Sequence, residues 1–203
     1  MIGAVTGEGR LLSDLLPAAV AHLEPPDRAR AGRLATETLR WASRADRVLG
    51  PYLRLRPRQR THDALRMAVW EICADGAAAH GAVNAAVTLL SETEETRGQA
   101  GLANAVLRKV AAADVDWDAL SLPQLPKWLR KPLVTDYGKS AVADIEAAHA
   151  AGAPLDLTLA PGAAPDLPGE RLPGGTLRLR GAGQVSALPG YAEGHWWVQD
   201  WAA

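Results

Sequence analysis

The sequence predicts a mainly α protein, in which a helical bundle is followed by a small α/β segment. Apolar residues recur at helical spacing through the first 150 positions. Gly and Pro together number 18 in residues 1–150, and 15 in the much shorter stretch 151–203. Because Pro removes a backbone donor and Gly adds unfolded-state entropy, the first part can sustain helices and the tail cannot. We therefore predict two domains, residues 1–150 and 151–203.

The predicted helices rest on helix-start residues and on the spacing of apolar residues. A short helix is predicted over 11–23, and a second begins after Pro25-Pro26-Asp27, with Asp27 as its N-cap and a less regular apolar stripe over 34–42. Three clearer apolar stripes at helical spacing come next: Leu65, Ala68, Val69 and Ile72; Val83, Ala86, Val87 and Leu90; Leu102, Ala105, Val106 and Val110. The spacing predicts six or seven helices in the first domain, joined by short connections.

The last two of these helices and three strands complete the prediction. Residues 126–137 and 139–150 form a helical hairpin around Gly138, which suits a left-handed C-cap. In the tail, apolar residues alternate with polar ones in the period of two that is typical of strands. The three predicted strands are 155–159, 177–180 and 196–198.

The composition excludes several classes of protein. The 203 residues carry a net charge of -1, so any contact with nucleic acid depends on a local patch. The single cysteine, Cys73, rules out an intrachain disulfide and a Cys-x-x-Cys zinc knuckle, and it favours a reducing, cytoplasmic setting. Apolar runs are too short for a membrane span.

We find no motif for catalysis, metal binding or cofactor binding. The histidines (His22, His62, His80, His149 and His195) show no His-x-x-x-His pairing. Cys73 lies on an apolar helical face near acidic residues, which favours core packing over a nucleophile. Neither the P-loop nor the Gly-x-Gly-x-x-Gly pattern occurs.

Arginine is unevenly distributed. Residues 1–66 hold 12 Arg and no Lys against 7 acidic residues, a modest signal for phosphate contact. Arg33, Arg40, Arg44 and Arg47 are spaced so that they share a helical face, and Arg54, Arg56, Arg58 and Arg60 follow around Pro57. A solvated helix face and an RNA-binding surface both fit this pattern.

Three motifs carry a family resemblance. These are Arg33-Leu-Ala-Thr-Glu-Thr-Leu-Arg-Trp41, Ala79-His-Gly-Ala-Val-Asn-Ala-Ala-Val-Thr-Leu and Gly101-Leu-Ala-Asn-Ala-Val-Leu-Arg-Lys109. In order and spacing they resemble the NusB-like helical domain of RsmB/Sun-type ribosomal RNA cytosine-C5 methyltransferases. In that family a small RRM-like segment and an S-adenosylmethionine-binding domain follow. Leu155-Asp-Leu-Thr158, Val185-Ser-Ala-Leu-Pro-Gly190 and Trp197-Val-Gln-Asp200 resemble the RRM-like segment and the first residues of the domain after it.

The resemblance also defines what we expect to be missing. The chain stops where the cofactor domain of the family would begin, so we expect no S-adenosylmethionine site and no catalytic cysteines here. Attack on carbon 6 of cytosine needs a thiolate, and Cys73 is in the wrong domain for it. We expect this chain to be inactive alone, with a C-terminal methyltransferase domain acting in cis. The first helix of the NusB-like domain is expected to be missing or cut short.

The resemblance implies a monomeric, cytoplasmic module without a membrane anchor that binds ribosomal RNA. Its expected RNA-binding residues are Arg33, Arg40, Arg44 and Arg47, followed by Arg108 and Lys109. Asn84 and Asn104 are expected to hydrogen-bond between helices rather than to contact bases. At most one of Trp196 and Trp197 is expected to face RNA, because neighbours in a strand point to opposite faces. Two alternatives remain open: a free-standing NusB-like antitermination module, and a non-functional remnant.

Overall fold

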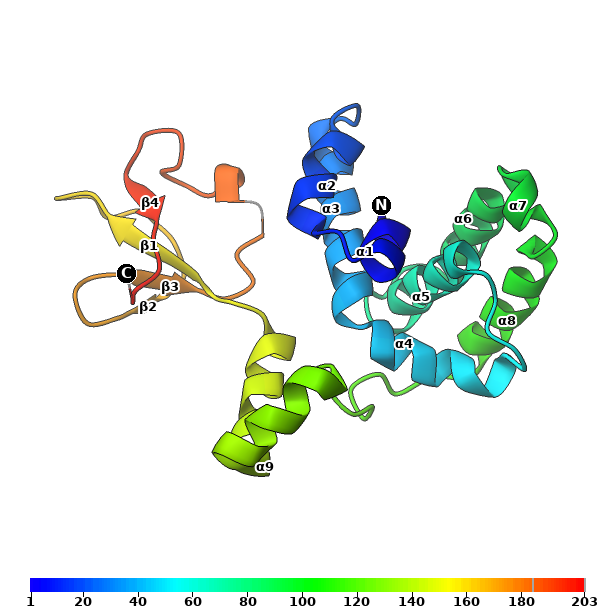
Figure 1. Ribbon diagram of the computed structural model, residues 1–203. Helices are drawn as coiled ribbons and strands as arrows, with labels where there is room; N and C mark the ends of the chain where they lie inside the picture. Colours follow the sequence, from blue (N-terminus) through cyan, green and yellow to red (C-terminus); the bar gives the residue numbers. More distant parts are fainter. Residues whose placement is uncertain (184, 203) are drawn as a thin grey trace. The chain divides into compact units, whose positions relative to one another are not determined.

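The computed structural model describes residues 1–183 and 185–202, so the predicted tail is covered except for Gln184 and Ala203 (Figure 1). The chain forms two compact units, residues 1–146 and the residues from 147 onward. The α-helices are α1 (Ile2–Glu8), α2 (Leu12–Val20), α3 (Pro25–Arg40), α4 (Ala42–Leu49), α5 (Gln59–Cys73), α6 (Ala79–Ser91), α7 (Glu94–Arg97), α8 (Ala100–Ala112) and α9 (Lys127–Ala151). No helix in the described ranges is long and apolar enough to cross a membrane.

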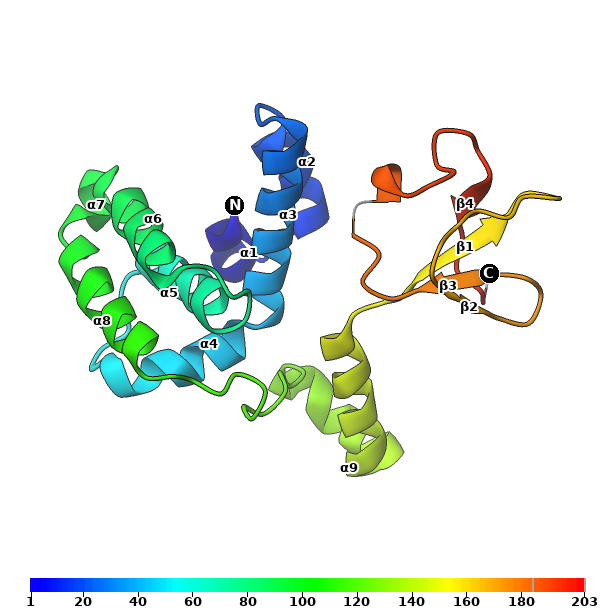
Figure 2. The same ribbon diagram turned by 180° about the vertical axis from the view of Figure 1, so that it is seen from behind.

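Helix α5 is the centre of the first unit. It packs against α3, α4, α6 and α8, as seen from behind in Figure 2. The predicted stripes on α5 and α6 face this core, where Leu65, Val69 and Leu90 are fully buried. The stripe predicted on α8 is only half correct, because Val106 and Val110 are buried in the core but Leu102 and Ala105 are exposed. Leu102 is 41% exposed, whereas Leu107 is fully buried in the core.

The start of the chain differs from the prediction in two places. Helix α1 precedes the first predicted helix and spans seven residues. Helix α3 begins at Pro25 after Glu24, so Asp27 lies in its first turn and is not the N-cap. Proline fits the first helical position because the N–H there has no intrahelical partner in any case.

The backbone at Trp41 separates two helices that the sequence pattern merged. Trp41 has φ -100° and ψ 11°, outside the α-helical values, so α3 ends at Arg40 and α4 begins at Ala42. Further along, a short 3-10 helix (Gly50–Tyr52) leads to the loop before α5.

Helix α9 is two helical segments joined at a kink. Gly138 has φ 83° and ψ 165°, a conformation reserved almost entirely for glycine, and Figure 1 shows the sharp turn. The predicted hairpin is therefore confirmed, but the ψ of Gly138 is not that of the left-handed C-cap predicted there. The Glu146 carboxylate braces it by accepting hydrogen bonds from Arg130 Nε at 2.8 Å and from the Leu125 amide at 2.9 Å.

The second unit contains a four-stranded antiparallel sheet. Its strands are β1 (Leu155–Leu159), β2 (Glu170–Arg171), β3 (Leu177–Leu179) and β4 (Trp196–Val198), in the order β2-β3-β1-β4. All three predicted strands are confirmed, and the short β2 was not foreseen. A small core of Leu157, Leu177, Leu179 and Trp196 covers one face, and a 3-10 helix (Val185–Ala187) precedes β4.

The residues after β4 cover part of the other face of this sheet. Asp156 lies there, 5% exposed, and accepts two hydrogen bonds of 2.7 Å from the Arg178 guanidinium. The backbone amide of Trp201 also donates to Asp156, and the indole N–H of Trp201 donates to the Pro173 carbonyl at 2.8 Å. These hydrogen bonds, led by that of Arg178, hold the pKa of Asp156 below its usual value. Trp197 lies on this partly covered face and is half exposed, whereas Trp196 lies on the core face and is buried.

Candidate nucleic-acid interface

The two predicted arginines of α3 already have carboxylate partners. The Arg33 guanidinium bonds to both oxygens of Asp75, with one distance of 3.2 Å, and its carbon lies 5.6 Å from the ring centre of Trp70. The hydrogen bond to Asp75 raises the pKa of Arg33. Arg40 pairs with Glu37 on the same helix. An RNA phosphate at either position would have to displace an acidic side chain.

The arginines of α4 hold a distant segment of the chain. Arg44 is 4% exposed, and its guanidinium carbon lies 4.5 Å from the ring centre of Trp41 and 5.7 Å from that of Trp117. Arg44 Nε donates to the Ser121 carbonyl at 3.3 Å, and Arg47 donates to the same oxygen at 2.7 Å.

The prediction that these four arginines share one exposed face is wrong. The helix breaks at Trp41, so Arg33 and Arg40 belong to a different helix from Arg44 and Arg47. Arg44 is also turned into the protein, where two indole rings replace solvent. The chemistry that suits arginine to phosphate, a planar cation with several donors, also suits it to stacking on tryptophan.

Arg108 and Lys109, the other two predicted RNA-binding residues, lie exposed in the last turns of α8. Neither side chain forms an ion pair or hydrogen bond with any residue in the described part of the chain. Arg108 borders a groove of about 330 Å³ between α6 and α8. These two cations are therefore available for an external anion.

The same groove contains two polar side chains from the start of α6. Asn84 Nδ2 lies 3.0 Å from His80 Nε2, one helical turn away, and both residues are exposed. The expected hydrogen bond between helices is therefore not made by Asn84. Asn104, on α8, is half-buried, and its side chain has no hydrogen bond among the described residues.

A second group of exposed arginines lies outside the predicted RNA-binding site. Arg54, Arg56, Arg58 and Arg60 are all exposed around the start of α5. Arg56 donates to the Gln59 amide oxygen and Arg58 to the Glu95 carbonyl, and none of the four pairs with a carboxylate in the described ranges. Arginine at every second position from 54 to 60 indicates this group in the sequence. It does not give the spacing of a helical face, because Pro57 excludes a regular helix there.

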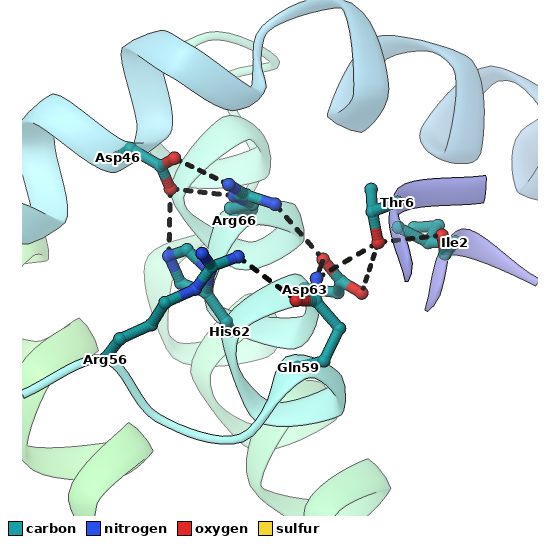
Figure 3. Close-up of polar contacts among 8 residues, drawn as sticks. All are labelled: Ile2, Thr6, Asp46, Arg56, Gln59, His62, Asp63 and Arg66. Carbon is teal, nitrogen blue, oxygen red and sulfur yellow. Dashed lines mark hydrogen bonds and ion pairs between the residues drawn. The ribbon is translucent and has the colours of Figure 1, made fainter. Parts of the chain in front are cut away.

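The polar cluster around Arg66 is structural. Figure 3 shows Asp46 of α4 bound by Arg66 of α5, with N···O distances of 2.7 and 2.6 Å, while Arg66 also reaches Asp63. Gln59 donates to Asp63 at 2.8 Å and to the Thr6 hydroxyl at 3.0 Å. The cluster therefore ties α1 and α4 to the central helix.

His62 is the titratable member of this cluster. Its Nε2 lies 2.9 Å from Asp46, which places the proton on Nε2, and its Nδ1 is buried without a partner among the described residues. Burial, reinforced by the charge of Arg66, lowers the pKa of His62. Burial alone would raise the pKa of Asp46, but Arg66 outweighs it and the pKa falls. A neutral imidazole beside an ionised carboxylate matches both shifts.

Neither metal binding nor thiol chemistry is supported by the part of the chain that the structure describes. No group of three His, Cys, Asp or Glu side chains is placed to hold an ion there. Cys73 is half-buried against the core, and burial raises its pKa, the opposite of what a nucleophile requires.

Comparison with known proteins confirms the family resemblance found in the sequence motifs. Residues 3–112 match the NusB family. The chain is also 31% identical to a protein named "Ribosomal RNA small subunit methyltransferase B" from Xanthomonas campestris pv. campestris, over 226 aligned positions. That alignment takes in 100% of this chain and 50% of the relative, so the chain spans about half the relative's length. The chain therefore belongs to the NusB family and is similar over its whole length to the NusB-like region of RsmB/Sun-type methyltransferases.

Proposed function

We propose that this chain is the RNA-binding part of a ribosomal RNA cytosine-C5 methyltransferase and that it positions ribosomal RNA for a catalytic domain. The observation that carries the proposal is the alignment of the whole chain with a relative named for methylation of small-subunit ribosomal RNA. Membership of the NusB family supports it. Methyl transfer from S-adenosylmethionine is then the work of the catalytic domain. The module acts as a monomer in the cytoplasm.

The available cations support RNA binding through phosphate contacts. Arg108 and Lys109 are exposed at one end of the helical unit, and the arginines around Pro57 lie at the other end of α5 and α8. Cations that already hold a carboxylate contribute less to RNA binding, because the existing ion pair must first be broken. The net charge of -1 confines the attraction to these local groups.

Binding to fragments of small-subunit ribosomal RNA at increasing salt tests the proposal. Release of condensed counterions should lower the affinity steeply, by roughly tenfold or more between 50 and 200 mM salt, for a module with several phosphate contacts. A filter-binding or fluorescence anisotropy titration with this chain gives the slope. An affinity that does not change with salt, or no binding at 50 mM salt, would overturn the proposal.

A further inference from the structure

The groove between α6 and α8 has the dimensions and chemistry of a small-ligand site. Its volume of about 330 Å³ is at the lower end of the range of roughly 300–1,000 Å³ that holds small molecules. Val83 of α6 and Ala111 of α8 contribute apolar walls. A single nucleotide fits this space, whereas a paired duplex cannot place a base in it.

Three polar side chains border these walls, and each leaves bonding capacity unused. The contact between Asn84 Nδ2 and His80 Nε2 leaves the amide oxygen of Asn84 and one of its N–H groups free. The Arg108 guanidinium, with five donors and no acceptor, has no partner among the described residues. The groove therefore presents an amide edge, an imidazole and a free guanidinium beside an apolar wall.

We propose that this groove takes one unpaired nucleotide of an RNA. The base lies against the apolar walls and His80, the amide of Asn84 bonds to the base edge, and Arg108 bonds to the adjoining phosphate. Proteins recognise single-stranded RNA in this way, since only an unpaired base can leave the stack and present its edge. The inference rests on the proposed function, because it needs a chain that binds RNA, and it adds where and in which form the RNA is read.

Two neighbouring residues provide matched controls. Asn104 is the asparagine at the corresponding place in α8, and it does not line the groove. Lys109 is exposed like Arg108 and carries the same charge one residue further on, also outside the groove. Asn84 and Arg108 can therefore each be compared with a residue of like chemistry that lies outside the groove.

The experiment compares two RNA hairpins of equal length, one fully paired and one with a single unpaired nucleotide in its stem. The wild-type chain should bind the second hairpin more tightly. Asn84→Ala should weaken binding of that hairpin about tenfold, the effect of one lost base contact, and leave the paired hairpin unchanged. Arg108→Ala should weaken it more than Lys109→Ala does, and Asn104→Ala should have no effect.

The outcomes separate this inference from the proposed function. If the wild-type chain binds both hairpins equally, or if Asn84→Ala and Asn104→Ala behave alike, the groove does not read a nucleotide and RNA binding itself still stands. If Arg108→Ala and Lys109→Ala weaken both hairpins equally, the two cations act only as surface charge and the inference is overturned. If the wild-type chain binds neither hairpin nor the longer ribosomal fragments, the proposed function fails and the inference fails with it.

Discussion

Arg44 has a structural role, although arginine is also the residue type expected to contact RNA phosphate. Its guanidinium is enclosed by Trp41 and Trp117 and donates to the Ser121 carbonyl, so its removal costs a buried hydrogen bond and a stacking contact. We expect Arg44→Ala to lower the free energy of unfolding by about 2–4 kcal/mol. Arg47 is exposed and donates to the same Ser121 carbonyl oxygen, so Arg47→Ala should lower the free energy of unfolding by less than about 1 kcal/mol. Urea unfolding followed by circular dichroism measures both, and equal losses would contradict the stacking account.

His62 should make stability depend on pH. The pKa of the folded imidazole lies below its ordinary value of 6.5, so below that pH the unfolded chain binds more protons than the folded one. The contribution of the neutral His62 to the free energy of unfolding is therefore complete above about pH 6.5 and is lost as the pH falls through the lowered pKa. The pKa of Asp46 is also lowered, but from 3.8, so a comparison between pH 7 and 5 isolates the histidine.

The matching variants test that assignment. His62→Gln keeps a donor toward Asp46 and removes the titration, so its free energy of unfolding should fall less between pH 7 and 5 than that of the wild-type chain. His22 is exposed, and His22→Gln should leave the wild-type slope in place. A slope that is unchanged in His62→Gln would mean that another group titrates.

At the scale of elements, the turn within α9 depends on one residue. Gly138 occupies a conformation, φ 83° and ψ 165°, that costs other residues about 1–3 kcal/mol. We expect Gly138→Ala to lower the stability of the hairpin by about that amount. Gly101→Ala is the control, because an added β-carbon there meets no atom within 4 Å and alanine favours a helix by up to about 1 kcal/mol. Thermal unfolding of both variants gives the comparison, and equal midpoints would show that glycine is not required at the turn.

Local sequence was sufficient to predict some elements and not others. The stripe ending at Ile72 and the three strands have a single strong period, so the core face follows directly from the sequence. The stripe starting at Leu102 is only half correct, with Val106 and Val110 buried and Leu102 exposed, because alanines on both sides of α8 make the period ambiguous. The break at Trp41 was missed because one partner of that indole is Trp117, with a ring-centre distance of 6.2 Å, far along the chain. Tertiary contacts of this kind leave no local pattern.

The same limit applies to the candidate site. Arg108 and Lys109 are exposed at the end of α8 and stay candidates for phosphate contact. The four arginines of α3 and α4 were ranked first on spacing alone. Their partners Asp75 and Ser121 lie far along the chain and leave no local pattern, whereas Glu37 is only three residues before Arg40.

For the whole molecule, RNA affinity should depend on a few unpaired cations rather than on total charge. Replacing Arg54, Arg60, Arg108 and Lys109 together by alanine should reduce the slope of log affinity against log salt by about 3, at roughly 0.7–0.9 for each lost phosphate contact. The double variant of Arg33 and Arg40, which already hold carboxylates, should change it less. Salt titrations of the three proteins with one RNA give the slopes, and a slope unaffected by the fourfold variant would place the RNA elsewhere.

The enclosed guanidinium between Trp41 and Trp117 also has an evolutionary consequence. A mutation of Arg44 alone leaves two indole rings facing an empty space, and a mutation of either tryptophan removes one of the two rings beside the guanidinium. Each single step is unfavourable, so selection should retain or replace the three residues as a set. Among descendants of a common ancestor, we therefore expect correlated substitution at positions 41, 44 and 117, while position 47 drifts independently.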